Sequence, residues 1–556
     1  MDVSNINSLV ELYFKKADQI DKKKKFLKWL NPDHDHYYSW NEVTEKIHKL
    51  SSKIRSLIEE GDRVLLLSEN RPEWLITDIA IMNAGGITVP IFTTYAKGDY
   101  EYIINDCSPS LIIVSNNNQF IKIKDFVTEK QKISFEKIET NSLTFNNIFK
   151  EDYKTKINTK LNRKALACII YTSGTSGNPK GVMLSHGGIL SNCEGALQLL
   201  QPLIKKRKPI FLTWLPLSHS YEHTVQMIQI LLGAKVYYAE NLEKLISNMK
   251  VAKPTIMTAV PRFYQNLYAK INMSFEKQKG FKKLMIFKTL NLGKKILENT
   301  DLSFYEKLQN FICQILVRKK IKSQFGGNLQ AFVSGGGALD QNVGEFLNAI
   351  GLPTLQGYGL TETSPVVSCN IPGKVKVETV GPPFSTNQVK ISDDGEILIK
   401  GENVMLGYWN QKDATRKVLK DGWLYTGDIG EIDENGYLKI TDRKKDIIVN
   451  HGGDNISPSK IENILCLNDF IKQSLVYGDQ KNYLVALIVA EKEVNKEKIK
   501  IIIENINKNL TNIEKIKKFV LIYEEFTIKN GMLTPTLKLK RKEIIKNYKQ
   551  QLENLY

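Results

Sequence analysis

Residues 169–182 read Ile-Ile-Tyr-Thr-Ser-Gly-Thr-Ser-Gly-Asn-Pro-Lys-Gly-Val, and this stretch decides the interpretation of the fold. An apolar strand over 166–170 runs into a loop of glycines and small hydroxylated residues, followed by a lysine and a second apolar run. Glycines let the backbone approach a polyphosphate, while N–H groups, hydroxyls and a cation supply ligands for its oxygens. The loop therefore predicts an anion site. Its candidate ligands are Thr172, Ser173, Gly174, Thr175, Ser176, Gly177 and Lys180.

This loop also has two simpler interpretations. A run of Ser and Gly by itself is most often only a flexible turn. A Walker-type P-loop is disfavoured, because Lys180 follows Gly174 by six residues but no Ser or Thr comes after the lysine. The functional interpretation therefore depends on support from other segments.

Five further segments supply that support. In chain order they are Ser334–Leu339 (SGGGAL), Gln356–Thr363 (QGYGLTET), Trp423–Asp428 (WLYTGD), Asp442–Asp446 (DRKKD) and Gly452–Pro458 (GGDNISP). Together with the 171–181 loop, these segments and their order resemble the AMP-forming acyl-CoA synthetase superfamily over most of residues 40–545. Each segment alone can arise by chance, whereas six of them in the family's order make coincidence a poor explanation.

The resemblance implies an α/β fold with a large N-terminal region of layered α/β subdomains, a β-rich subdomain and a small mobile α+β C-terminal domain. We place the large domain at 1–442 and the small one at 443–556. Short apolar runs alternate with helical patterns from residue 63 onward, which favours βαβ units. Residues 264–325 predict a Lys-rich helical insertion, and 376–442 predict short strands and turns. Residues 8–58 are expected to be helical from their apolar spacing.

The resemblance also implies a two-step reaction. A fatty carboxylate attacks the α-phosphate of ATP, with Mg²⁺, to give acyl-AMP and pyrophosphate; the thiol of coenzyme A then displaces AMP. Val260-Pro261-Arg262, Gly326-Gly327 and the segment Leu215–His219 are more similar to long-chain synthetases than to ligases of acetate or aryl acids. An acyl carrier protein is the alternative acceptor of the acyl group.

Roles for single residues follow from the same resemblance. The nucleotide-binding set is Gly336, Gln356, Gly357, Tyr358, Gly359, Asp428 and Arg443, with Thr361 at the α-phosphate, Mg²⁺ on Glu362 and Thr175, the hinge at Lys445 and the thiol channel near Gly453. The residue types suit these roles. A tyrosine ring stacks on adenine, carboxylate oxygens suit Mg²⁺ and the ribose hydroxyls, and a guanidinium donates to ribose or phosphate.

The family's adenylation lysine aligns with Lys538 in the segment 530–541. Many members have Ser-Gly before this lysine, whereas this chain has Thr536-Leu537, as in long-chain members. Lys540 is the competing assignment, and a solvated basic surface is the simplest alternative for both lysines.

A rival motif lies at His219–His223, which reads His-Ser-Tyr-Glu-His. It fits H-x-x-E-H, an inverted zinc-protease pattern, and would make the protein a zinc hydrolase. So short a pattern arises easily by chance, and the preceding residues 214–218 continue the synthetase segment. We expect His219 to line the acyl or adenylate site.

Composition restricts the alternatives further. The chain has 556 residues, 42% of them hydrophobic and 25% charged, which is typical of a globular protein. Six scattered cysteines without CxxC spacing predict neither a disulfide framework nor a zinc site. No secretory signal and no uncharged apolar run of about 18 residues is evident, so a cytoplasmic location is expected.

The net charge is +18, from 78 basic and 60 acidic residues, and the C-terminal residues 443–556 carry +7 of it. No zinc-finger, RNP or helix-turn-helix pattern accompanies the charge, so no nucleic-acid partner is expected. The small domain can instead face ATP, pyrophosphate and the phosphates of coenzyme A. The expected localisation includes peripheral contact with the inner face of an anionic membrane. A merely Lys-rich composition is the alternative.

Overall fold

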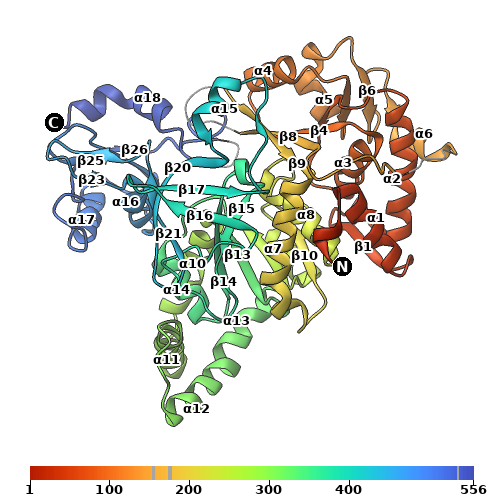
Figure 1. Ribbon diagram of the computed structural model, residues 1–556. Helices are drawn as coiled ribbons and strands as arrows, with labels where there is room; N and C mark the ends of the chain where they lie inside the picture. The colour runs from red at the N-terminus through yellow and green to blue at the C-terminus, as the bar shows by residue number, and fades with distance from the viewer. Residues whose placement is uncertain (153–156, 173–177, 535–536) are drawn as a thin grey trace.

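The protein is built around two eight-stranded sheets, as shown by a computed structural model that describes residues 1–152, 157–172, 178–534 and 537–556 (Figure 1). A five-stranded sheet and a three-stranded C-terminal sheet follow along the chain. In the described part of the chain, no helix is long and apolar enough to cross a lipid bilayer.

The first eight-stranded sheet has the strand order β18-β9-β8-β4-β3-β5-β6-β7. Its strands are β3 (Arg63–Leu67), β4 (Ile87–Ile91), β5 (Leu111–Val114), β6 (Gln131–Ser134), β7 (Leu143–Thr144), β8 (Leu166–Thr172), β9 (Lys180–Ser185) and β18 (Gly407–Tyr408). The strands β3 to β8 run parallel, with helices α3 (Pro72–Ala84), α4 (Lys97–Cys107), α5 (Asn117–Ile123) and α6 (Phe145–Lys150) between them. The alternation expected from residue 63 onward is therefore a set of βαβ units.

The second eight-stranded sheet has the order β15-β14-β13-β12-β10-β11-β1-β2. Its strands are β1 (Lys25–Trp29), β2 (Tyr37–Ser39), β10 (Ile210–Thr213), β11 (Lys235–Tyr238), β12 (Ile256–Ala259), β13 (Ala331–Ser334), β14 (Thr354–Gly359) and β15 (Val366–Cys369). The expectation of helix throughout 8–58 is wrong in its middle. Helices α1 (Leu9–Gln19) and α2 (Trp40–Arg55) flank β1 and β2, because β1 pairs with the distant β11.

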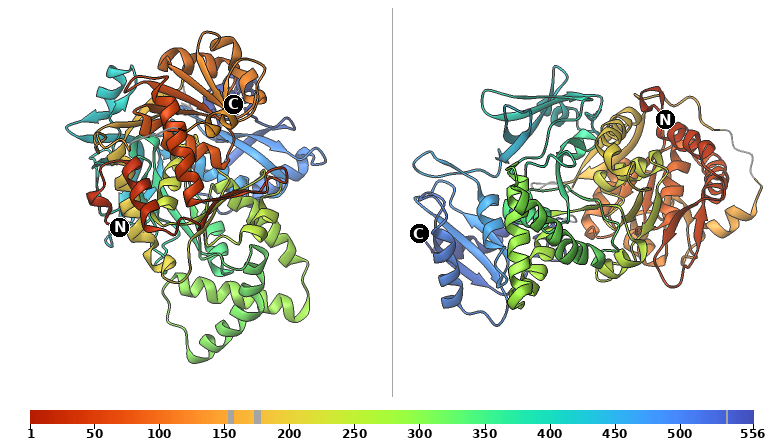
Figure 2. Two further views of the ribbon diagram at one scale, coloured as in Figure 1. Left: turned by 90° about the vertical axis from the view of Figure 1, so that its right-hand side faces the viewer. Right: turned by 90° about the horizontal axis from the view of Figure 1, so that it is seen from below.

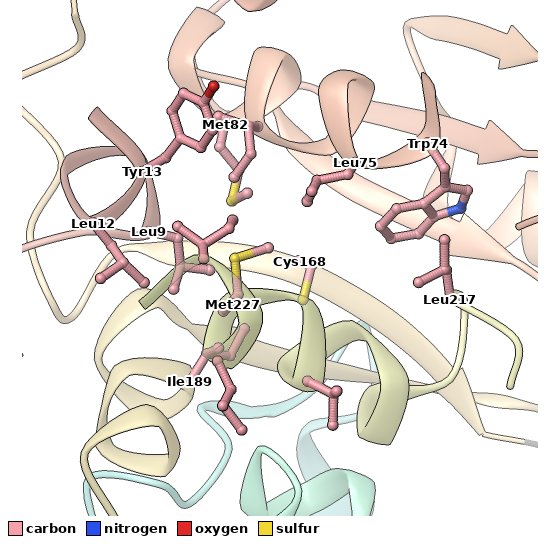
Figure 3. Close-up of a cluster of buried hydrophobic side chains, with 14 of the residues drawn as sticks. Leu9, Leu12, Tyr13, Trp74, Leu75, Met82, Cys168, Ile189, Leu217 and Met227 are labelled. Carbon is pink, nitrogen blue, oxygen red and sulfur yellow. The ribbon is translucent and has the colours of Figure 1, made fainter. Parts of the chain in front are cut away.

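The main hydrophobic core lies between the two sheets. Helices α1, α3, α7 (His186–Ile204) and α8 (Ser220–Leu231) fill this layer, and Figure 3 shows Leu9, Trp74 and Met227 as members of its cluster of buried side chains. Neighbouring strand residues point to opposite faces, so Phe211 joins this core while Leu212 joins the core on the far side of its sheet. Helices α4 and α5 cover the outer face of the first sheet; α9 (Leu245–Ala252), α10 (Pro261–Glu276) and α14 (Gln341–Ala349) cover that of the second. The result is the layered α/β arrangement that was expected.

The predicted helical insertion is present. It comprises α10, α11 (Gly280–Leu297), α12 (Phe304–Cys313), a π-helical turn (Gln314–Arg318) and α13 (Lys319–Gln324). Figures 1 and 2 show α11 and α12 projecting away from the sheets. We call the segment 277–322 the helical lobe.

The chain then forms short strands, as expected for 376–442. The five-stranded sheet contains β16 (Asn387–Ile391), β17 (Glu396–Gly401), β19 (Leu419–Lys420), β20 (Trp423–Ile432) and β21 (Leu438–Arg443), with α15 (Lys412–Val418) before β19. Because β20 pairs with β21, Asp428 lies directly opposite Arg443. This register brings two predicted site residues together.

The C-terminal residues form an α+β unit with its own core. Its elements are the hairpin β22 (Ile448–Val449) and β23 (Asn455–Ile456), α16 (Pro458–Leu465), β24 (Ile471–Tyr477), β25 (Leu484–Ala490), α17 (Lys496–Asn507), β26 (Ile516–Ile522) and α18 (Arg541–Glu553). The central strand β25 is buried on both faces. Helices α16 and α17 cover one face, and α18 covers the other.

Candidate active site

A single cavity of about 840 Å³ gathers residues from both eight-stranded sheets, the five-stranded sheet and the C-terminal unit. Its walls include the ends of β8 and β14, helices α7 and α8, the β17–β21 region and Lys538 of the C-terminal unit. One part of its lining carries lysines, an arginine and carboxylates, whereas another is apolar. The apolar part includes Ala196, Leu199, Leu200, Phe211, Val225, Ile228, Ile256 and Phe384.

The described residues on either side of the predicted anion loop lie at the cavity, at the end of β8 and the start of β9. Thr172 and Lys180 are paired across the two strands, and both line the cavity. The Lys180 ammonium lies 4.7 Å from the centre of the Tyr408 ring. The predicted ligands Ser173, Gly174, Thr175, Ser176 and Gly177 lie outside the residues that the structure describes.

The segment after β13 and the end of β14 form the opposite wall. Gly336, Gly357, Tyr358, Gly359, Thr361 and Glu362 all line the cavity. A Cβ atom on Gly359 would lie only 1.8 Å from the carbonyl oxygen of Pro365, so no larger residue fits this close backbone approach. Gln356 directly precedes Gly357 on β14 but is not part of the lining.

Asp428 is the centre of a hydrogen-bonded group behind this wall. Its Oδ2 accepts from the Tyr358 hydroxyl at 2.7 Å, and its Oδ1 accepts from Arg443 Nε at 3.1 Å. Burial and then the Asp428 carboxylate raise the pKa of the Tyr358 hydroxyl above its usual value. Tyr358 and Arg443 reach the cavity, while the buried Asp428 holds both from behind.

Lys538 enters the cavity from the C-terminal unit and lies near His219, Glu362 and Arg443. The surrounding protein atoms, and next the Arg443 cation, lower the pKa of Lys538 to about 8. The residue as a whole stays exposed because solvent reaches the cavity. Lys540 does not line the cavity; its N–H donates to the Met532 carbonyl just before α18.

His219 caps the N-terminus of α8, where its Nδ1 accepts from the Tyr221 N–H at 3.2 Å. Burial and then the nearby Lys538 ammonium lower the pKa of His219 to about 4, so the imidazole is neutral at pH 7. Of the hinge and channel residues, Lys445 lines the cavity. Gly453 lies in the β22–β23 turn and is not part of the lining.

The three residues of the H-x-x-E-H pattern have separate partners. His219 faces the cavity, Glu222 accepts a hydrogen bond from Thr258, and His223 pairs with Asp78 at 2.9 Å. His223 also lies 4.0 Å from the Cys168 sulfur. Within the described ranges, no group of three His, Cys, Asp or Glu residues is arranged to hold a metal ion. The geometry therefore gives no support to a zinc hydrolase.

Comparison with known proteins identifies the family of the chain. Residues 14–409 match the family described as AMP-binding enzyme. The chain belongs to the AMP-binding enzyme family. Residues 445–556 match the C-terminal domain of AMP-binding enzymes.

Curated relatives of this AMP-binding enzyme cover almost all of it. A long-chain-fatty-acid–CoA ligase of Mycobacterium bovis is 29% identical over 93% of this chain and 92% of its own. Long-chain-fatty-acid–CoA ligase 5 of Rattus norvegicus is 30% identical over 94% of this chain and 84% of its own. An anthranilate CoA ligase structure is 20% identical, with a TM-score of 0.77 over 98% of this chain and 99% of its own.

Sequence reasoning missed several residues in the cavity of this AMP-binding enzyme. The Tyr408 hydroxyl donates a hydrogen bond to Glu362 Oε1 at 2.8 Å, and the Ser220 and Thr361 hydroxyl oxygens are 3.2 Å apart. Ser220 directly follows the Leu215–His219 segment, so its neighbourhood was a usable signal. Tyr408 follows Glu362 by 46 residues, and no local pattern connects the two.

Proposed function

We propose that this AMP-binding enzyme is a long-chain fatty acid–CoA ligase that forms acyl-AMP and pyrophosphate from ATP, then acyl-CoA and AMP. One observation carries the proposal: a single cavity joins a polar, partly cationic lining to an apolar lining. The cationic part suits the phosphates of ATP, and the apolar part suits a hydrocarbon chain. The names of the curated relatives support the same substrate class.

The first step brings a carboxylate to a polyphosphate, so the site must neutralise like charges. The fatty carboxylate oxygen attacks the α-phosphorus, forms the new P–O bond, and breaks the bond to pyrophosphate. Lys180, Arg443 and Lys538 supply positive charge around the cavity for this transfer. Thr361, whose hydroxyl oxygen lies 3.2 Å from that of Ser220, is proposed to donate to an α-phosphate oxygen. No nucleophile from the protein is required, because the substrate carboxylate fills that role.

The Mg²⁺ that the family implies fits the donor set. Mg²⁺ is usually held by one or two carboxylates together with substrate phosphates and water. Glu362 lines the cavity and is held in place by the Tyr408 hydroxyl on one of its two oxygens. Glu362 would hold the ion, with Thr175 as the second proposed ligand; the ion would neutralise phosphate charge.

The adenosine part is proposed to bind at Tyr358 and Asp428. Asp428 is buried behind Tyr358 and Arg443 and is not part of the lining. Each carboxylate oxygen has more than one acceptor position, so we propose that ribose hydroxyls reaching Asp428 use the positions that these two donors leave free. Gly336, Gly357 and Gly359 leave room for the base next to the Tyr358 ring. Gln356 is proposed to support this wall from β14.

The second step is proposed to follow rotation of the C-terminal domain 443–556 about Lys445. Rotation would withdraw Lys538 and present the turn containing Gly453 to the thiol of coenzyme A. The thiol gives up its proton to water, its sulfur forms the bond to the acyl carbon, and the bond between that carbon and the phosphate oxygen of AMP breaks.

We expect Lys445→Pro to slow thioester formation while adenylate formation changes little. Proline fixes φ near −65° and so removes the backbone freedom that rotation needs. Within the described residues, the Lys445 N–H donates no backbone hydrogen bond, so the substitution by proline breaks none in the structure before rotation. Single-turnover assays of the two half-reactions would separate the effects, and unchanged overall turnover would contradict the hinge assignment.

The substrate class is tested by pyrophosphate release over a series of fatty acids of increasing length. Release without coenzyme A would report adenylation alone, and its stimulation by coenzyme A would report the complete reaction. Mass spectrometry of products with coenzyme A or an acyl carrier protein would identify the acceptor. Failure to release pyrophosphate with any fatty acid would exclude the proposal.

We expect Ala196→Phe to shorten the accepted acyl chain. Ala196 is buried on α7 and lines the apolar part of the cavity, so a phenyl ring there fills space that a hydrocarbon chain would use. The kcat/KM for long acids should fall at least about tenfold, because each buried CH₂ contributes about 0.8 kcal/mol. Short acids should be unaffected, and an equal loss across all lengths would contradict this assignment.

A further inference from the structure

Helix α12 of the helical lobe turns its apolar face toward solvent. Phe304, Leu308 and Phe311 recur at helical spacing and are 87%, 52% and 62% exposed. Tyr305 and Ile312 lie beside them and are also exposed. A helix that packs on its own protein's core buries such a stripe instead.

The polar face of α12 is fixed against the protein. Glu306 Oε1 accepts from Lys295 of α11 at 2.6 Å, and Asn310 Oδ1 accepts from Arg318 at 2.7 Å. The buried Arg318 also donates to the Thr289 carbonyl of α11 at 3.2 Å and to the Ala349 carbonyl at 2.7 Å. These bonds set the rotation of α12, so its exposed apolar stripe is part of the packed arrangement.

Helix α11 extends this surface with apolar and basic side chains together. Phe281 and Phe287 are 67% and 61% exposed, and Leu284 is exposed between them. The neighbouring Lys282 and Lys283 are exposed and form no ion pair with any residue that the structure describes. We call these exposed side chains of α11 and α12 the lobe face. The two helices that carry this face project from the molecule in Figure 1 and Figure 2.

The helical lobe also concentrates charge. Residues 277–322 contain 12 basic and three acidic residues, a net charge of +9, which is half of the +18 of the whole chain. Residues 443–556 carry another +7, so all remaining residues together carry only +2. The apolar side chains of the lobe face are thus embedded in the most basic segment of the protein.

The exposed apolar side chains and the positive charge together favour one kind of partner for the lobe face. A second copy of the chain would bring another +9 lobe against the first, and like charges oppose that contact. A bilayer with anionic headgroups offers both complements: Phe and Leu enter the boundary between headgroups and acyl chains, while lysines meet the headgroup charge. We propose that the lobe face docks on anionic phospholipid membranes. The membrane proposal rests on the proposed function only for its biological purpose: fatty acids partition into bilayers, so a ligase on the membrane would be close to its substrate.

The test is co-sedimentation of the full chain with phosphatidylcholine vesicles, with and without phosphatidylglycerol. We expect binding to the phosphatidylglycerol vesicles and its weakening by salt, since salt screens exposed charges. The variant F304S/F311S should lower the vesicle partition coefficient at least about tenfold, because two large apolar groups are removed. K282E/K283E should lower it about tenfold or more.

Two controls make the result decisive. K546E/K549E removes the same charge from exposed positions on α18 and should bind like the unaltered chain. Pyrophosphate release, measured without detergent and with a short-chain fatty acid as substrate, should be equal in all variants. Equal release would show that the variants fold. Binding that all variants retain, or no binding by the unaltered chain, overturns the proposal. A dimer that dissociates in F304S/F311S would overturn the membrane proposal and assign the lobe face to contact with a second copy of the chain. Vesicle binding by a protein without ligase activity would contradict only the proposed function.

Discussion

Lys538→Ala is expected to lower the rate of acyl-adenylate formation by about 10²–10³, the usual cost of removing one donor that stabilises developing charge. Lys538 lies in the cavity beside Glu362 and Arg443, where it can reach a transferring phosphoryl group. Thioester formation from supplied acyl-AMP should be nearly unchanged, because that step is proposed to proceed with Lys538 withdrawn. Pyrophosphate release and thioester formation, measured separately, check the two statements.

Lys540→Ala is the matched control and should change neither half-reaction more than a few-fold, since Lys540 does not line the cavity. Equal loss of both half-reactions in Lys538→Ala would refute its assignment. The pH profile adds a second signature. Because the pKa of Lys538 is about 8, its charge is present below that pH, and adenylation should decline as the pH rises through about 8. In Lys538→Arg any remaining activity should lack this decline.

The second large effect concerns stability. Asp78→Leu is expected to lower the free energy of unfolding by about 3–5 kcal/mol, because it leaves His223 without the partner of a fully buried ion pair. Asp78 on α3 and His223 on α8 join two helices of the central core, and Trp74 lies against the His223 ring. Denaturation followed by tryptophan fluorescence would measure the loss.

The double variant D78L/H223L is the control. It removes both charges and replaces them with apolar side chains, so it should recover most of the lost stability. Burial alone would lower the pKa of His223, but Asp78 outweighs it and raises the pKa to about 10, above the ordinary 6.5. The pair's contribution is therefore complete below pH 6.5 and is lost as the pH rises through about 10. If Asp78→Leu were as stable as the unaltered chain at pH 6, the pair would have no structural role.

Local patterns predicted much of the fold but failed where pairing is long-range. The βαβ alternation and the helical lobe followed from apolar spacing and composition. Strand β1 did not, because Phe26 and Leu27 are both buried and show no alternation that separates a strand from a helix. Its conformation is set by pairing with β11, more than 200 residues away.

The site shows the same division. Contiguous motifs predicted Tyr358, Glu362 and Arg443, and the structure brings these residues to one cavity. Tyr408 was not predictable, because its contact with Glu362 exists only after β18 joins the first sheet. The segment 530–541 favoured Lys538 over Lys540 by its resemblance to the family and left Lys540 as the alternative. Their roles stay a prediction, although only Lys538 lines the cavity.

The uneven charge has a consequence for handling the protein. The basic isoelectric point of 9.2 results mainly from two segments, the helical lobe and residues 443–556. All other residues together carry a net charge of only +2. The electrostatic repulsion between molecules, which helps to keep a protein in solution, therefore originates in these two segments. A shortened chain without them would lie close to electroneutrality at pH 7 and would be prone to precipitate, although both large sheets were intact.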